Sequence, residues 1–343
     1  MENNFCLKGI PLLTRQREFS FLGFRSGNSA FSETKPIGKL MKTITGNVVR
    51  KPYSQIGQSV NSLNSAISAV GFEIRSRPVL DSLNSKPIAN KQGLFRSDND
   101  TCLDIHSNRF SFNQPADSLA VLERARHIVG GSWSSVKVNK GGRMIVSFIE
   151  LEGKVVAPQR GDQIGLSIGH FDYFDGSGLE HFRMFANVIA CNNGMTNSKA
   201  LFSFSSKHIG NTSERIADLE GRLQYLFVQA KDEMQATVSQ LDNSPMNRYE
   251  MQHFVAQLFP TKDEDNIPTR VLNLREQITT GFIRGTGNVG QTRFDAFNAV
   301  TEYLDWSSTF KETEFSREEN RFESVLTGNV ADVRARALEL LLN

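Results

Sequence analysis

The sequence has few residues of the kinds that build disulfide frameworks or zinc sites. Its 343 residues include only three cysteines and six histidines. Cys6, Cys102 and Cys191 lie far apart, and neither Cys-x-x-Cys nor His-x-x-x-His spacing occurs. An odd number of widely spaced cysteines is typical of a protein from a reducing compartment, and it argues against a zinc site. We therefore expect no disulfide, metal or other cofactor.

Long apolar runs are also absent. No stretch approaches the ~18 consecutive apolar residues that indicate a transmembrane helix. The basic N-terminal residues are not followed by the hydrophobic segment of a secretory signal. Hydrophobic residues make up 39% of the chain and charged residues 22%, which is ordinary for a soluble globular protein. These features predict a cytoplasmic protein with no membrane contact.

Signatures of nucleotide-dependent enzymes are weak. No GxxxxGK[ST] loop is present, so an ATP-driven motor is not expected. Residues 285–290 (GTGNVG) match GxGxxG, but helix-like segments flank them. A dinucleotide fingerprint needs a strand before the glycines and a βαβ unit around them. We interpret residues 285–290 as a loop that opens the next helix.

Two other chemistries stay open as alternatives. His170, Asp172 and Asp175 lie close together, as in a metal-dependent nuclease, although aspartates at turns are more often structural. Cys191 and His208 are conceivable as a nucleophile and its base, although a thiol at the end of an apolar strand is more often buried and inert. We expect a protein that is not an enzyme.

The periodicity predicts an α+β fold, in which an antiparallel β-meander with one inserted helix is followed by a mainly α-helical C-terminal half. Residues 161–194 are central: alternating apolar residues predict a half-buried strand, and the turn Asp175–Gly178 leads to a second strand. Residues 133–151 predict a hairpin. Strands are further expected at 72–80 and 105–113, on either side of a turn-rich stretch. Helices are expected at 54–71, 117–129, 213–241, 248–259, 271–279, 292–306 and 330–342.

Charge is distributed unevenly along the chain, although the formal net charge is only +2. Residues 1–53 contain nine Lys/Arg and three acidic residues, and we interpret them as a basic, loosely structured arm. The arm precedes two further predicted regions, an α+β core at 54–212 and a helical region at 213–343 that packs on the core. A basic arm on a near-neutral body is a common feature of nucleic-acid-binding proteins.

The predicted sheet combines cations with aromatic rings. A cationic sheet with exposed rings holds single strands without sequence preference, because phosphates meet Lys/Arg and bases stack on rings. An ordinary charged outer face is the alternative. The residues that we predict to bind nucleic acid are Lys137, Lys140, Arg143, Lys154, Arg160, Phe171, Tyr173, Arg183, Lys199 and Lys207.

Several blocks together carry a family resemblance. They are Asp175-Gly176-Ser177, the run from Arg183 to Gly194 that ends in Cys-Asn-Asn-Gly, Lys207 to Gly210, residues 93–114 and residues 292–306. As a set they resemble the phage/plasmid-like protein family of prokaryotic mobile elements, a family of unknown function. The resemblance implies a phage or plasmid source and a bacterial host cytoplasm.

The order of helix, hairpin, long strand, turn and helix is also similar to that of Rad52-like single-strand annealing proteins, which form rings and need no ATP. We therefore expect an ATP-independent protein of a mobile element that binds or anneals single-stranded DNA in recombination and forms a homo-oligomer. The main alternative is a non-enzymatic interaction protein, either an anti-defence factor or a virion component. A metal- or Cys-dependent enzyme is the third possibility.

Overall fold

The computed structural model describes residues 55–110, 112–159, 161, 163–178, 180–188, 194–196, 202–203 and 212–343. Contacts between Cα atoms group the chain into two compact units, Met1–Val48 and Val49–Asn343. All described residues belong to the second unit. The predicted arm at residues 1–53 and three predicted site residues, Arg160, Lys199 and Lys207, lie outside the described residues.

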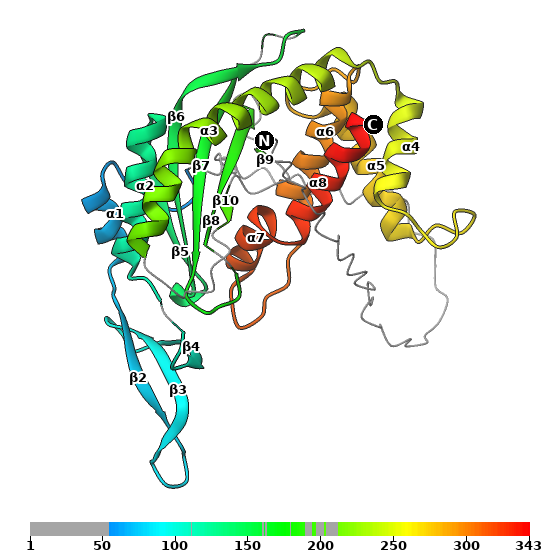
Figure 1. Cartoon of the computed structure of the whole chain (residues 1–343). Helices are drawn as coiled ribbons and strands as arrows, with labels where there is room; N and C mark the ends of the chain where they lie inside the picture. The colour runs from blue at the N-terminus through cyan, green and yellow to red at the C-terminus, as the bar shows by residue number, and fades with distance from the viewer. Residues whose placement is uncertain are drawn as a thin grey trace, which may run out of the picture. The chain divides into compact units, whose positions relative to one another are not determined.

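The predicted α+β fold is confirmed, because antiparallel strands dominate the first half of the described chain and helices the second (Figure 1). The main sheet has the strand order β1-β5-β6-β7-β8-β10, and β9 also pairs with β8. Its described pairings are antiparallel. The strands are β1 (Gln58–Ser59), β5 (Ser132–Asn139), β6 (Met144–Val156), β7 (Gln163–Tyr173), β8 (His181–Val188), β9 (Gly194–Thr196) and β10 (Phe202–Ser203).

A second sheet of three strands stands beside the first, where we expected one continuous sheet. It contains β2 (Ile74–Leu80), β3 (Pro87–Arg96) and β4 (Cys102–Ser107) in that order. β3 falls in the stretch predicted to be rich in turns, and that prediction was wrong. This strand contains Gly, Pro and Asn, which have a low strand propensity. Its pairing with β2 on one side and β4 on the other outweighs that low propensity.

Eight α-helices complete the described chain. Helix α2 is the predicted insertion between strands, and α3 is the predicted long helix. Helix α7 was not predicted, because its first two turns are almost entirely polar. The helices are α1 (Leu63–Val70), α2 (Pro115–Val129), α3 (Thr212–Asn243), α4 (Arg248–Leu258), α5 (Thr269–Arg284), α6 (Arg293–Glu302), α7 (Arg317–Leu326) and α8 (Asn329–Leu342). None of them is long and apolar enough to cross a bilayer within the part of the chain that the structure describes.

Helix α1 begins later than predicted, at Leu63. The side chain of Ser62 accepts a hydrogen bond from the backbone N–H of Ser65, and Ser65 caps Ser62 in return, so the first turn is satisfied there. Upstream, Gly57 has a φ of +128°, which a helix does not allow. The predicted end is confirmed, because Gly71 adopts the left-handed conformation with a φ of +74°.

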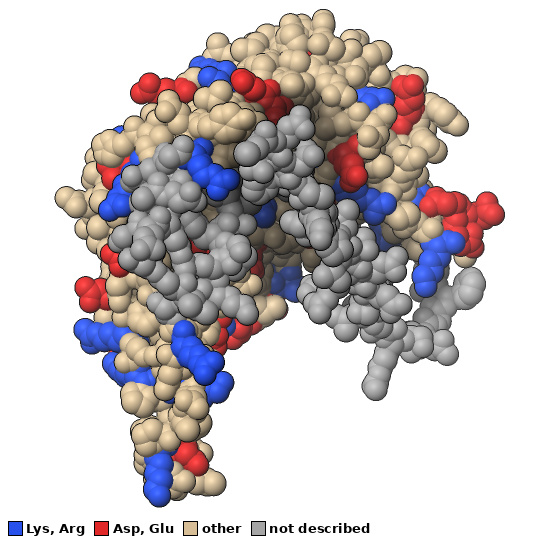
Figure 2. Space-filling model, in the orientation of Figure 1, with Lys and Arg blue, Asp and Glu red and all other residues tan. Residues whose placement is uncertain are grey.

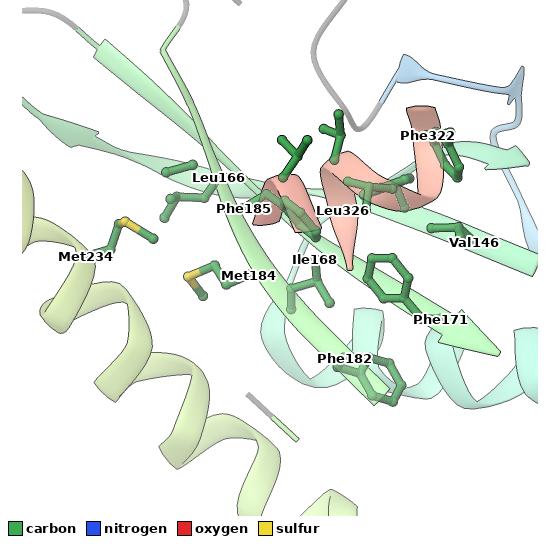
Figure 3. Close-up of a cluster of buried hydrophobic side chains, with 14 of the residues drawn as sticks. Val146, Leu166, Ile168, Phe171, Phe182, Met184, Phe185, Met234, Phe322 and Leu326 are labelled. Carbon is green, nitrogen blue, oxygen red and sulfur yellow. The ribbon is translucent and has the colours of Figure 1, made fainter. Parts of the chain in front are cut away.

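The centre of the main sheet is buried on both faces (Figure 3). On one face, Met184 of β8 lies opposite Met234 of α3, and Asp172 of β7 bonds to α2. On the other face, Phe171 and Phe185 lie under Phe322 and Leu326 of α7. The prediction that β7 is half-buried was wrong, because Ile164 and the residues from Leu166 to Tyr173 are all buried. Helix α7 covers the face of β7 that we had expected to be exposed to solvent.

A buried ion pair ties the helical half together. Arg334 of α8 and Asp305 are each 1% exposed and form a salt bridge. Asp305 belongs to the π-helical turn Tyr303–Ser307 that follows α6, and Arg334 also donates to the carbonyl of Val325 in α7 at 3.2 Å. Breaking such a pair from one side leaves an uncompensated buried charge, which costs about 3–5 kcal/mol. The pair therefore fixes α8 against both α7 and the turn after α6.

We predict that Gly176→Val destabilises the fold by about 1–3 kcal/mol, since a β-branched residue is strained in the left-handed region. Gly176 has a φ of +68°, and a Cβ there lies 3.0 Å from Cε1 of His106. Gly176→Asn is the matched control, because it adds the same Cβ but tolerates this backbone conformation. Thermal unfolding measures both variants, and equal losses for Val and Asn would refute the backbone explanation.

Candidate functional site

The predicted cations of the β5–β6 hairpin lie against the C-terminal segment. Lys137 Nζ is 3.5 Å from Glu318, Lys140 Nζ is 2.5 Å from Glu323, and Arg143 Nη1 is 3.1 Å from Glu314. Rings of the same segment lie next to these cations. Lys137 lies 5.1 Å from the centroid of Phe322, and Lys140 and Arg143 lie 5.4 Å and 5.1 Å from that of Phe315.

These contacts change the interpretation of the hairpin. Each cation has a carboxylate partner and a ring partner, and the Lys137 and Lys140 side chains are 16% and 18% exposed. Glu319 of helix α7, which also carries Glu318 and Glu323, accepts a hydrogen bond from the backbone N–H of Lys140 at 2.9 Å. The open cationic groove predicted on this hairpin is therefore absent from the described residues: an acidic helix, α7, occupies its place.

The predicted stacking rings are also corrected. Phe171 has no exposed surface and stacks on His181, with centroids 4.7 Å apart and planes 3° apart. Tyr173 is buried, its hydroxyl lies 3.4 Å from Thr327 Oγ1, and burial raises its pKa to about 12. Neither ring has the free face that a nucleic-acid base needs. Lys154, by contrast, is exposed and bonds to the side chain of Gln163.

The structure does bring two predicted residues together at a cavity. Tyr173 and Arg183 line a space of about 480 Å³ between the end of the main sheet and the α7–α8 turn. The turn Asp175–Gly178 forms another wall, where Asp175 accepts the backbone N–H of Ser177 at 2.9 Å. The complete lining is Tyr173, Ser177, Gly178, His181, Arg183, Glu323, Ser324, Thr327, Gly328 and Asn329.

Arg183 is the cation of this cavity, and no carboxylate of a described residue lies within 4.0 Å of it. Its Nη1 donates to the carbonyl of Leu326 at 3.1 Å, while its Nε is buried without a hydrogen-bond partner. Burial lowers the pKa of Arg183, and the nearby charges of Tyr173 and Asp332 oppose that shift. A partly buried guanidinium with one neutral acceptor is under-compensated, so the cavity favours an anion.

The opposite face of β7 holds a buried polar cluster. Asp172 accepts a hydrogen bond from Ser118 of α2, and His170 Nε2 lies 2.9 Å from Glu180. His170 and Asp172 do share a strand face, as predicted, but Asp175 lies in the turn. Among the described residues no group of three potential ligands surrounds a common point where a metal ion would bind. Burial, with the charge of Glu180, raises the pKa of Asp172 to about 7.

The remaining motif residues have clear positions or lie outside the described chain. Residues 285–290 form a loop after helix α5, with no strand before it. The carboxylate of Asp295 holds this loop by accepting the N–H groups of Val289, Gln291 and Thr292. The interpretation as a loop rather than a dinucleotide fingerprint is confirmed. Cys191 and His208 lie outside the described residues.

Sequence reasoning missed α7 and the α7–α8 turn, which supply half of the cavity. Glu323, Ser324, Thr327, Gly328 and Asn329 all come from residues 323–329. One signal was present: Ser316 followed by Glu319 is a capping box, which marks a helix start. The helix that follows is mostly polar, so apolar periodicity gives no second signal for it.

We predict that Asp172→Asn stabilises the protein more at about pH 8 than at about pH 5. The folded state binds a proton on Asp172 up to about pH 7, whereas the unfolded group has a pKa near 3.8. The folded state therefore loses stability as pH rises through that window, by about 2 kcal/mol between the two conditions, and Asn removes this loss. Thermal unfolding at both pH values measures it. Ser118→Ala, which leaves the carboxyl in place, is the control, and an equal offset at both pH values would contradict the raised pKa.

The comparisons with known proteins give a family and nothing finer. A family model described as a domain of unknown function (DUF932) matches residues 102–326, which include β4 to β10, α2 to α6 and α7. Neither the search of curated proteins nor the search of solved structures found a match. The matched residues include the hairpin that α7 covers and seven of the ten residues that line the cavity, all but Thr327, Gly328 and Asn329. The chain belongs to the DUF932 family of domains of unknown function.

Proposed function

We propose that this chain is an ATP-independent protein of a phage or plasmid that binds single-stranded DNA, anneals it in recombination and acts as a homo-oligomer. The observation that carries the proposal is a cationic β-arm, the hairpin of residues 75–92 formed by β2 and β3. In Figure 1 the arm extends away from the main sheet, and in Figure 2 basic side chains line it. We propose this β-arm, in place of the β5–β6 hairpin, as the surface that contacts the phosphates of DNA.

Four cations are exposed on the β-arm against one acid. The cations are Arg75, Arg77, Lys86 and Lys91, and the acid is Asp81. The carboxylate of Asp81 is engaged within the tip turn, where it accepts the N–H of Leu83 at 2.8 Å. Arg77 pairs with Asp100, whereas the other three cations make no ion pair with a described residue. They are therefore available to phosphates, and phosphate contacts supply most of sequence-independent binding.

The tip of the β-arm adds apolar contact. Leu83 is 94% exposed, and Leu80 and Ile88 are about half exposed. Apolar side chains beside cations can insert next to unstacked bases, as wedge residues do in architectural DNA-binding proteins. The strands β5 to β8 lie between α2 and α3, and the order of helix, hairpin and long strand is the feature on which we compare the chain with Rad52-like annealing proteins. A shared order of elements does not by itself establish function.

The alternative function is that of a non-enzymatic interaction protein. The exposed Leu83 favours it too, because an apolar tip on a projecting hairpin also suits a hydrophobic pocket on a protein partner. The two functions differ in what the cations contribute. Nucleic-acid binding depends on all of them and weakens steeply with salt, whereas docking through the tip depends on Leu83.

We predict that replacing Arg75, Lys86 and Lys91 with Gln weakens binding to a single-stranded oligonucleotide on the order of 10- to 100-fold at about 0.1 M salt. Each lost phosphate contact removes about 0.7 from the slope of log affinity against log salt, so the slope falls by about 2. Gel shifts at several salt concentrations measure both quantities. The control replaces Arg248, Lys262 and Arg284 with Gln, which removes three exposed cations from the helical half.

Two outcomes would overturn this proposal. If the wild-type protein binds no single-stranded DNA at low salt, nucleic-acid binding is excluded. If both triple variants lose affinity equally, net charge rather than the β-arm is responsible. Leu83→Asp addresses the alternative, since a protein-docking arm would lose its partner with this one change while the salt slope stayed the same.

A further inference from the structure

We propose that the cavity lined by Tyr173, Arg183 and the α7–α8 turn is a binding site for a phosphate ester of nucleotide size. This site is separate from the β-arm and does not depend on it. Four features of the lining support the proposal: an under-compensated cation, a helix N-terminus, a set of neutral hydroxyl groups, and the volume of the space.

The cation is Arg183. It carries a full charge at neutral pH, and its described hydrogen bond is to a neutral carbonyl, that of Leu326. Asp332, whose charge raises the pKa of Arg183, is exposed on the first turn of α8, so solvent screens its interaction with the guanidinium. An anion in the cavity supplies the charge that the protein does not, and charge-assisted hydrogen bonds from Arg to phosphate are among the stronger ones.

The helix is α8, whose first residues face the same space. Gly328 is its N-cap and Asn329 its first residue, and glycine has no side chain with which to cap this end. Val330 N–H is satisfied by Ser324 Oγ at 3.4 Å, a long bond. The positive end of a 14-residue helix and its free backbone N–H groups attract phosphate. Together with Arg183, α8 places positive potential on two walls of the cavity.

The remaining lining suits an ester rather than bare phosphate. Ser177 and Ser324 offer hydroxyl groups, while Thr327 Oγ1 already donates to the carbonyl of Glu323 at 3.2 Å, and Tyr173 and His181 form one side. The one carboxylate of the lining, Glu323, is already paired with Lys140 at 2.5 Å, so it adds little net negative charge. About 480 Å³ exceeds what inorganic phosphate fills and lies within the range of small-molecule sites. The cavity therefore has room for a sugar or base beside the phosphate.

The test is thermal unfolding of the full chain with thymidine 5′-monophosphate, thymidine, inorganic phosphate, and sodium chloride at matched ionic strength. We expect the monophosphate to raise the melting temperature most, inorganic phosphate to raise it less, and thymidine and chloride to leave it unchanged. Arg183→Gln should abolish both shifts, and Arg183→Lys should retain part of them. Arg248→Gln, an exposed arginine of α4, is the matched control and should respond as the wild type does.

A second variant keeps the test decisive if Arg183→Gln does not fold. Asn329→Asp places a carboxylate in the first turn of α8, where it favours the helix but repels an anion in the cavity. This variant should melt at or above the wild-type temperature and yet lose the shift caused by monophosphate. A merely structural role of the α8 terminus would leave that shift intact. Equal responses of wild type, Arg183→Gln and Asn329→Asp, or no response of the wild type, would overturn the site.

One more comparison distinguishes the two sources of such a phosphate, the 5′ end of a DNA strand and a free nucleotide. Oligonucleotides with and without a 5′-phosphate are tested in gel shifts against the wild type and Arg183→Gln. Tighter binding of the phosphorylated strand, lost in the variant, assigns the cavity to a strand terminus. Equal binding of both strands, with the monophosphate shift retained, assigns it to a free nucleotide. The variant without Arg75, Lys86 and Lys91 must keep the monophosphate shift, so failure of the β-arm and failure of the cavity are distinguishable.

Discussion

Helix α7 lies on the main sheet with an apolar edge directed to the core and an acidic edge directed to the β5–β6 hairpin. Phe322 and Leu326 fill the space over Phe171 and Phe185, while Glu318 and Glu323 reach Lys137 and Lys140. Burial of the apolar edge, worth roughly 1.5–3 kcal/mol per large side chain, keeps the carboxylates in place. The ion pairs alone would hold the helix weakly, since partly exposed pairs contribute about 0–1 kcal/mol each.

The position of α7 decides which cations of the molecule remain available. The β5–β6 cations are neutralised, whereas Arg75, Lys86 and Lys91 on the β-arm have no described ion-pair partner. The same helix ends at the α7–α8 turn, which closes the cavity around Arg183. One packing contact thus removes the predicted binding surface and creates one wall of the proposed phosphate site. The two proposed sites use different cations and different parts of the fold.

A buried polar cluster lies between α2 and the face of the main sheet that α7 does not cover. Asp172 has Ser118 as a hydrogen-bond donor and Glu180 as a like-charged neighbour, and burial keeps it protonated up to about pH 7. Desolvation disfavours the charged form of a carboxyl, so keeping Asp172 protonated costs less free energy than burying its negative charge. Of the residues that suggested a nuclease from their spacing, Asp172 therefore belongs to the packing of α2 against β7, and Asp175 belongs to the turn.

Local patterns in the sequence determined the α+β class, the β5–β6 hairpin, most helices, the end of helix α1 at Gly71 and the turn Asp175–Gly178, because turns, caps and periodicity depend on near neighbours. Tyr173 and Arg183, which were predicted to bind nucleic acid, both line the cavity. The tertiary structure alone decided that the β2–β4 sheet is separate, that Phe171 is buried, and that Lys137 and Lys140 are paired. The burial of Phe171 and the pairing of the two lysines depend on α7, which lies about 180 residues away from the hairpin in sequence. The contacts that place α7 there are long-range, and no local pattern encodes which surface a polar helix will cover.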